Sequence, residues 1–145
     1  MDRYIDKLVN MQVVGMGRIK NTFCIRFSND KESYVLQVEA AWRIKDKNTK
    51  TIVVAQMDEF MQSEENKEIT IFGIKIKNLK NKIKNNLVTS CGMNDYGDLK
   101  IGIGNHYILE VFIDTSEEEE CWRIQKYESD EKQYVFYGKR GGIFE

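Results

Sequence analysis

The stretch Tyr34-Val35-Leu36-Gln37-Val38, with Trp42-Arg43-Ile44 shortly after it, occurs twice in this chain in similar form. The second copy is Tyr107-Ile108-Leu109-Glu110-Val111, and Trp122-Arg123-Ile124 follows it after a longer gap. Apolar and polar residues alternate in both copies, which is the period of a strand with one buried face. The sequence therefore predicts an internal duplication of a β-meander.

The same alternation, together with turn residues, predicts the other strands. In the first copy strands are expected at residues 12–16, 22–28, 34–38, 42–44 and 51–55. In the second copy they are expected from about residue 88 and at 99–103, 107–113, 122–124 and 134–137. Gly92-Met93 is matched with Gly15-Met16, and residues 138–142 are expected to form a mobile, basic ending.

The segment between the copies has a different character. Residues 58–68 are polar and acidic and are expected to form a loop with one helical turn, and residues 69–72 are expected to form a short strand. Apolar residues then recur at i, i+3, i+7 and i+11, the spacing of one helix face. They are Ile76, Leu79, Ile83 and Leu87. This lysine-rich amphipathic helix is expected to cover strand edges or an open sheet face.

The predicted fold class is α+β, mainly β. Two copies of a roughly four-stranded antiparallel meander are expected in a pseudo-twofold arrangement, with one amphipathic helix between them and a short N-terminal helix from Asp2 to about Val9. Each copy alone has about 50 residues, which is marginal for independent stability. Residues 1–145 are therefore expected to form a single domain, with repeats at about 12–57 and 88–138 and a connector at 58–87.

Composition argues against several classes of function. The chain of 145 residues has 22 basic and 23 acidic residues and a net charge of −1, so it lacks the basic excess of a dedicated nucleic-acid binder. Its three cysteines have no CxxC or zinc spacing, and no metal or cofactor is predicted. There is neither a signal-like N-terminus nor an apolar run of membrane-spanning length, so no membrane partner is predicted. Thiols without an export signal favour a cytoplasmic location.

Catalysis by histidine would have to use His106, the single histidine of the chain. It follows Gly104-Asn105 in a tight turn, where an exposed bystander is the favoured interpretation. The stretch at 102–106 has two glycines but lacks the third glycine and the following helix of a phosphate-binding loop. The lysines of the predicted helix have no interleaved aromatic residues to stack bases and are interpreted as a solvated face. No catalytic residues are predicted, and an enzyme built on His106 ranks last.

The acidic loop after the second Tyr-x-Leu-x-Val strand is the leading candidate site. It is an insertion relative to the first copy, and consecutive glutamates resist burial unless a cationic partner neutralises them. One interpretation is a solvated turn, and the other is an electrostatic docking surface for a basic protein. The proposed partner-binding residues are Asp114, Glu117, Glu118, Glu119 and Glu120, with Phe112 and Tyr127 as aromatic anchors.

The paired arginines supply the alternative site. Alternation places Trp42 and Ile44 inward and Arg43 outward, and Arg123 repeats this arrangement. Gln37, Glu39 and Glu110 are expected as cross-strand partners. Arg43 and Arg123 then form either two surface ion pairs or two guanidinium groups lining an anion pocket.

The repeated Tyr-x-Leu-x-Val strands with Trp42-Arg43-Ile44 and Trp122-Arg123-Ile124 resemble a group of small bacterial proteins with duplicated β-meanders. Some of these are immunity-like proteins that accompany toxin genes. The resemblance covers about residues 12–137 and implies no catalytic residues. The leading hypothesis is a non-enzymatic, cytoplasmic protein-binding protein, in its specific form an immunity protein that neutralises a basic toxin domain through the acidic loop. The alternative is a small-molecule or anion-binding module that uses Arg43 and Arg123, and the oligomeric state stays open.

Overall fold

The structure is a computed structural model that describes residues 5–65, 67–117, 120–128, 131–139 and 142–144, with side chains described as far as Lys126. The first copy forms β1 (Gln12–Ile19), β2 (Thr22–Ser28), β3 (Ser33–Val38), β4 (Ala41–Asp46) and β5 (Thr51–Ala55). The second forms β6 (Val88–Met93), β7 (Leu99–Ile103), β8 (Tyr107–Phe112), β9 (Trp122–Glu128) and β10 (Glu131–Lys139), and β11 (Gly142–Phe144) follows. The helical elements are η1 (Asp6–Leu8), η2 (Gln56–Phe60) and α2 (Ile71–Ile83).

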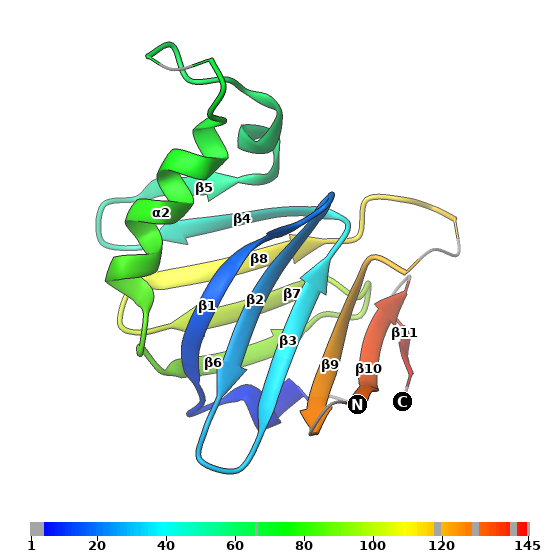
Figure 1. The fold of residues 1–145 in the computed structure, drawn as a ribbon. Coiled ribbons are helices and arrows are strands. Elements are labelled where there is room, and N and C mark those ends of the chain that lie inside the picture. Colours follow the sequence, from blue (N-terminus) through cyan, green and yellow to red (C-terminus); the bar gives the residue numbers. More distant parts are fainter. Residues whose placement is uncertain (1–4, 66, 118–119, 129–130, 140–141, 145) are drawn as a thin grey trace.

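The strands form two antiparallel sheets that face each other and cross steeply (Figure 1). The six-stranded sheet has the order β1-β2-β3-β9-β10-β11, and the five-stranded sheet has the order β5-β4-β8-β7-β6. Each copy thus gives three strands to one sheet and its next two strands to the other. The predicted mainly β fold with a helix between two copies is confirmed, and the copies exchange strands.

The registers of β4 and β9 confirm the predicted pseudo-twofold. Trp42 lies opposite Val111 on β8, and Trp122 lies opposite Val38 on β3. These two valines end the repeated Tyr-x-Leu-x-Val stretches, so the indoles occupy equivalent sites. Both are buried, with 3% and 0% of their surface exposed. The duplication is therefore one of tertiary structure as well as sequence.

Irregularities in the strands repeat as well. The β1–β2 register shifts between Val13 and Gly15, and the β6–β7 register shifts at the equivalent place, between Val88 and Ser90. After the shift, Gly92 occupies the place of Gly17, so the predicted match of Gly92-Met93 with Gly15-Met16 is wrong by two residues. Because both copies carry the bulge, it does not shift one copy against the other, and the two Gly-Met pairs are alike in sequence without occupying equivalent positions.

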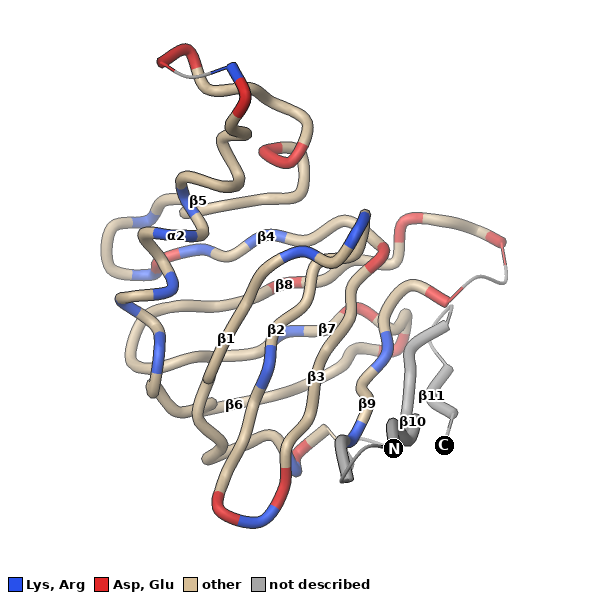
Figure 2. The backbone as a smooth tube through the Cα atoms, in the orientation of Figure 1, with Lys and Arg blue, Asp and Glu red and all other residues tan. Residues whose placement is uncertain are grey.

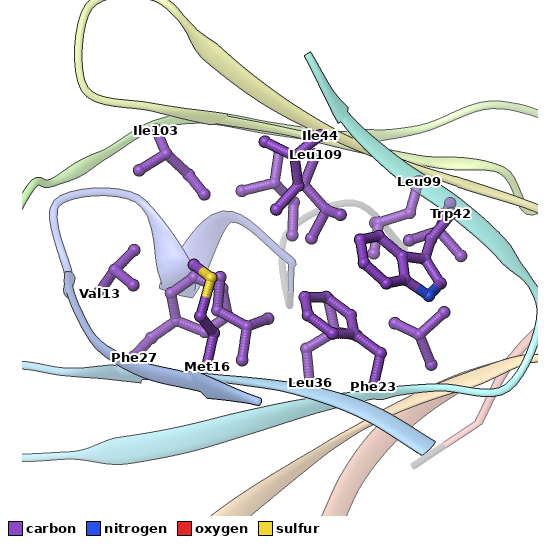
Figure 3. Close-up of a cluster of buried hydrophobic side chains, with 14 of the residues drawn as sticks. Val13, Met16, Phe23, Phe27, Leu36, Trp42, Ile44, Leu99, Ile103 and Leu109 are labelled. Carbon is purple, nitrogen blue, oxygen red and sulfur yellow. The ribbon is translucent and has the colours of Figure 1, made fainter. Parts of the chain in front are cut away.

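A single hydrophobic core lies between the sheets (Figure 3). Trp42 stacks on Phe23 of the opposite sheet with ring centroids 3.9 Å apart, and Phe72 of α2 meets both rings edge-on. The Trp122 indole Nε1 donates to the carbonyl of Gly97 at 2.9 Å. Burial of one such large apolar side chain contributes roughly 1.5–3 kcal/mol.

The helix α2 begins at Ile71, because the Thr70 side chain caps it by accepting a hydrogen bond from the Gly73 amide at 3.1 Å. The predicted strand at 69–72 is therefore wrong. The predicted apolar face is confirmed as far as Ile83, but Leu87 lies beyond the helix and is 44% exposed. The helix packs against β5 and β1, the outer strands of the two sheets.

The chain ends differ from expectation. The N-terminal helix is a single 3-10 turn, η1, whose Leu8 is buried, and the predicted cap Asp2 lies outside the described residues. The ending predicted to be mobile contains the last residues of β10 and the first of β11, with 140–141 outside the described residues. None of the helices described is long and apolar enough to cross a membrane.

Candidate protein-binding surface

The connector between the two copies folds against them through specific polar contacts. After β5, the amide of Ala55 donates to Asp58 Oδ2 at 3.0 Å, and this contact starts η2. Lys75 of α2 lies 3.9 Å from the same carboxylate. The short helix η2 packs against α2, β4 and β5, so its place beside the smaller sheet is determined by several elements.

The chain then forms a narrow hairpin that leads into α2. The Ser63 amide donates to the Ile69 carbonyl at 2.8 Å, and the Ile71 amide donates to the Met61 carbonyl at 2.7 Å. Residue 66, at the turn of this hairpin, lies outside the described residues. The backbone on both sides of the hairpin is thus paired, although the sequence predicted a loop here.

An ion pair joins η2 to the end of β1. Glu59 is 6% exposed, and its Oε1 lies 3.5 Å from Arg18 Nε. Neither of these two atoms has a hydrogen-bond partner among the described residues. Burial raises the pKa of the Glu59 carboxyl, and the charge of Arg18 only partly opposes this effect. The pair therefore brings the connector and the β1–β2 hairpin to the same end of the molecule.

Large apolar side chains are exposed at this end. Met57 is 65% exposed, Phe60 64% and Met61 51%. Of the nine large apolar side chains that are exposed in the described part of the chain, six lie here: Ile19, Met57, Phe60, Met61, Ile69 and Ile74. We call these six side chains the connector surface. Concentrated exposed apolar residues mark interaction sites, and methionine and phenylalanine are enriched in such interfaces.

Acidic residues lie beside Met57, Phe60 and Met61 of the connector surface, whereas Ile19 and Ile74 have Lys20 and Lys75 as sequence neighbours. The exposed carboxylates of Glu64, Glu65 and Glu68 lie on the hairpin, and Asp58 lies on η2. Figure 2 shows these acids above α2, whose own length carries lysines. An apolar centre with a negative rim is complementary to an apolar protein surface with a positive rim.

The predicted acidic loop is tied to the fold at both ends. Asp114 Oδ2 accepts a hydrogen bond from the Ala41 amide at 3.1 Å, and Glu120 pairs with Arg123 at 3.1 Å. Glu117 is exposed, whereas Glu118 and Glu119 lie outside the described residues. Asp114 and Glu120 therefore have structural partners, and Glu117 is the one described glutamate of this loop that is exposed.

Of the two predicted aromatic anchors, the structure describes the side chain of one. Phe112 ends β8 and is half-buried, with the guanidinium carbon of Arg43 5.5 Å from its ring centroid. Tyr127 lies on β9, but its side chain is outside the described part. Of the two, only Phe112 has a described position, and Arg43 lies over its ring.

Each arginine pairs with an acid of the other copy. Arg43 Nε donates to Glu110 Oε1 at 2.8 Å, and Arg123 pairs with Glu39 at 3.1 Å, so these expected partners are confirmed. Burial raises the pKa of Glu110, but hydrogen bonds from Arg43 and Lys45 outweigh it and lower the pKa below its ordinary value. Because the arginines lie on the outer faces of different sheets, the structure does not bring them into one pocket.

His106 has a partner that the sequence did not suggest. Its Nδ1 lies 3.0 Å from Asp46 Oδ1, and its ring packs on Tyr107. Asp46 also accepts from the Asn48 amide, and the Lys47 amide donates to the His106 carbonyl. The pair therefore joins the β4–β5 and β7–β8 turns. No group of three or more His, Cys, Asp or Glu side chains within the described ranges is placed to hold a metal ion.

No protein-family model matches the chain, and no curated protein or solved structure shows significant similarity to it. The function must therefore be inferred from the surface itself. Phe60 and Met61 were not predicted because residues 58–68 were interpreted as a polar loop, and Met57 was assigned to the end of the first repeat. Three large apolar residues next to acidic ones, in a segment without strand or helix periodicity, were the signal available.

Proposed function

We propose that this chain is a non-enzymatic protein-binding protein and that its partner binds the connector surface. The observation that carries the proposal is the exposure of Met57, Phe60 and Met61 on a backbone held by the hairpin and by the packing of η2 against α2, β4 and β5. A fixed backbone loses little conformational entropy on binding. Most of the free energy gained by burying the exposed side chains can therefore contribute to affinity.

The chemistry of the partner follows from the rim. Residues 56–70 contain five acidic residues and one lysine, so the partner is expected to be apolar at its centre and rich in lysine or arginine around it. In its specific form, the proposal is a cytoplasmic immunity protein that neutralises a basic toxin domain, as the resemblance of the repeated strands implies. The acidic loop would then add long-range attraction, which mainly raises the association rate.

The experiment compares two matched triple variants in capture from the source organism. Met57→Ser/Phe60→Ser/Met61→Ser removes the centre of the connector surface, and Ile52→Ser/Leu87→Ser/Tyr96→Ser removes three other exposed large apolar side chains elsewhere. A protein retained by the wild type and the second variant but not by the first would support the proposal. Its affinity should fall by roughly 2 kcal/mol or more per central anchor, measured by calorimetry with the purified partner. Equal retention by both variants would overturn it.

A second candidate function is anion binding, and one observation favours Arg43 for it. A depression of about 370 Å³ is lined by Arg43, Lys45, Lys47 and Lys50, together with Asp46, Thr51 and Ile52. Arg123 takes no part in it. If this candidate is right, inorganic phosphate or sulfate should raise the melting temperature of the wild type and of Arg123→Ala but not of Arg43→Ala. Equal shifts in all three proteins would exclude it.

A further inference from the structure

A second surface lies between α2 and β1, the outermost strand of the larger sheet. The two elements enclose a groove of about 440 Å³. One wall is the β1 segment from Val13 to Met16, and the other carries Lys77, Lys80 and Lys84. The spacing of these lysines puts them on one side of the helix. No carboxylate lines the groove, and none of the three lysines has an ion pair with a described residue.

The edge of β1 that faces the groove is only partly paired. At its start, the Val13 amide donates to the Asn86 carbonyl at 2.9 Å, and the Asn85 amide donates to the Val13 carbonyl at 2.8 Å. Beyond Val13, no backbone group in the described part of the chain bonds to this edge. The open edge therefore begins after Val13, within the segment from Val13 to Met16 that lines the groove.

The register identifies the unpaired groups. The two-residue turn at 20–21 makes Ile19 and Thr22 a hydrogen-bonded pair, and such pairs alternate along an antiparallel ladder. Gly17 therefore bonds to β2, whereas Met16 and Arg18 direct their amide and carbonyl groups to the open edge. These four groups have the spacing that an added strand requires.

Lysines often serve only to keep a strand edge from pairing with another chain. Here, however, Lys77 and Lys80 lie on α2 and Lys84 directly follows it, and the edge segment itself carries no charge from Val13 to Gly17. The groove leaves room along the edge of β1, and a Cβ added at Gly17 would meet nothing within 4 Å, so the sheet face is open there as well. The edge is therefore accessible, and the positive charge lies across the groove from it.

We propose that this groove binds an extended acidic segment of another protein as an added strand of the larger sheet. The main chain of that segment pairs with Met16 and Arg18, and its carboxylates lie against Lys77, Lys80 and Lys84. A small anion would use the lysines but not the strand edge, and the edge is what favours a peptide. This site adjoins the connector surface at Arg18, next to Ile19, but the proposal does not depend on that surface.

The first test uses a capped synthetic peptide of alternating glutamate and valine, with binding followed by fluorescence anisotropy at low salt. The wild type should bind it, and Lys77→Gln/Lys80→Gln/Lys84→Gln should bind about tenfold more weakly. Lys31→Gln/Lys47→Gln/Lys50→Gln, which removes three exposed turn lysines, should bind like the wild type. Equal loss in both variants would show a response to net charge alone and would overturn the proposal.

The second test separates strand addition from charge attraction. Two further peptides carry N-methyl groups on one or the other set of alternate amides. Methylation of the set that faces β1 should abolish binding, while the other peptide should bind normally. Amide exchange at Met16 and Arg18, followed by NMR, should slow when the unmethylated peptide binds. The proposal would be overturned if both methylated peptides bound, or if equimolar inorganic phosphate displaced the peptide. Salt-sensitive self-association of the wild type through these lysines would also overturn it.

Discussion

Trp42 and Phe23 stack across the two sheets, with ring centroids 3.9 Å apart and an angle of 12° between their planes. The contact joins β4, the strand that crosses to the smaller sheet, to β2 of the larger sheet. It therefore lies between the two sheets, at the strand with which the first copy crosses from the larger sheet to the smaller one.

Replacement of Trp42 by alanine should destabilise the protein by about 3–5 kcal/mol, because it removes a buried indole and leaves a cavity against Phe23 and Phe72. Urea unfolding followed by circular dichroism measures the change. Trp42→Phe is the matched control and should cost clearly less. A loss below about 1 kcal/mol for the alanine variant would show that the two sheets do not depend on this contact.

The Arg43–Glu110 pair should make stability depend on pH. The pKa of Glu110 is lowered in the folded protein, so its contribution is present above the unfolded value of about 4.3 and is lost as pH falls through the folded value. Glu110→Gln should lose roughly 1.5–3 kcal/mol at pH 7 and show less acid sensitivity than the wild type. Unfolding free energies at several pH values, with Arg43→Gln in a double-mutant cycle, would measure the coupling. Additive effects of the two substitutions would contradict the pairing.

Glu59 should have the opposite pH dependence. Burial raises its folded pKa, so its ionisation disfavours the folded state once pH rises above the unfolded value of about 4.3. Glu59→Gln should therefore be more stable than the wild type at pH 7, and the two should converge in acid. Arg18 keeps 25% of its side chain exposed and can stay hydrated in the variant. A variant that is less stable at pH 7 would show that attraction to Arg18 exceeds the cost of burial.

Two glutamates of the acidic loop should respond differently to substitution. Glu117→Gln should change the unfolding free energy by less than about 0.5 kcal/mol, because Glu117 is exposed. Glu120→Gln removes the ion pair with Arg123 and should cost about 0.2–1 kcal/mol. Thermal unfolding of both variants in low and high salt measures these effects, and the difference between them should shrink in high salt. If both variants lost the same stability in low and in high salt, the ion pair of Glu120 with Arg123 would not contribute to stability.

Most strands and the face of α2 could be predicted because their signals are local. The alternation around Leu36 and Leu109 and the helical spacing of Ile76, Leu79 and Ile83 depend only on which face is buried. The start of α2 was misjudged because Ile69-Thr70-Ile71-Phe72 has strand-like composition, whereas the cap at Thr70 decides the outcome. The candidate surface was missed for a related reason, since exposure of Met57, Phe60 and Met61 depends on what η2 packs against.

The sequence by itself determined the duplication and the buried faces of the strands, because side-chain period and core composition are properties of short segments. Only the tertiary structure decided which strands pair. A hairpin across the two-residue link Glu39-Ala40 would place Trp42 opposite Gln37, on the outer face of the sheet. Pairing of β4 with β8 instead places Trp42 opposite Val111 and inside the core. The burial of one indole therefore favours the exchange of strands, and that preference is satisfied only when both copies are folded together.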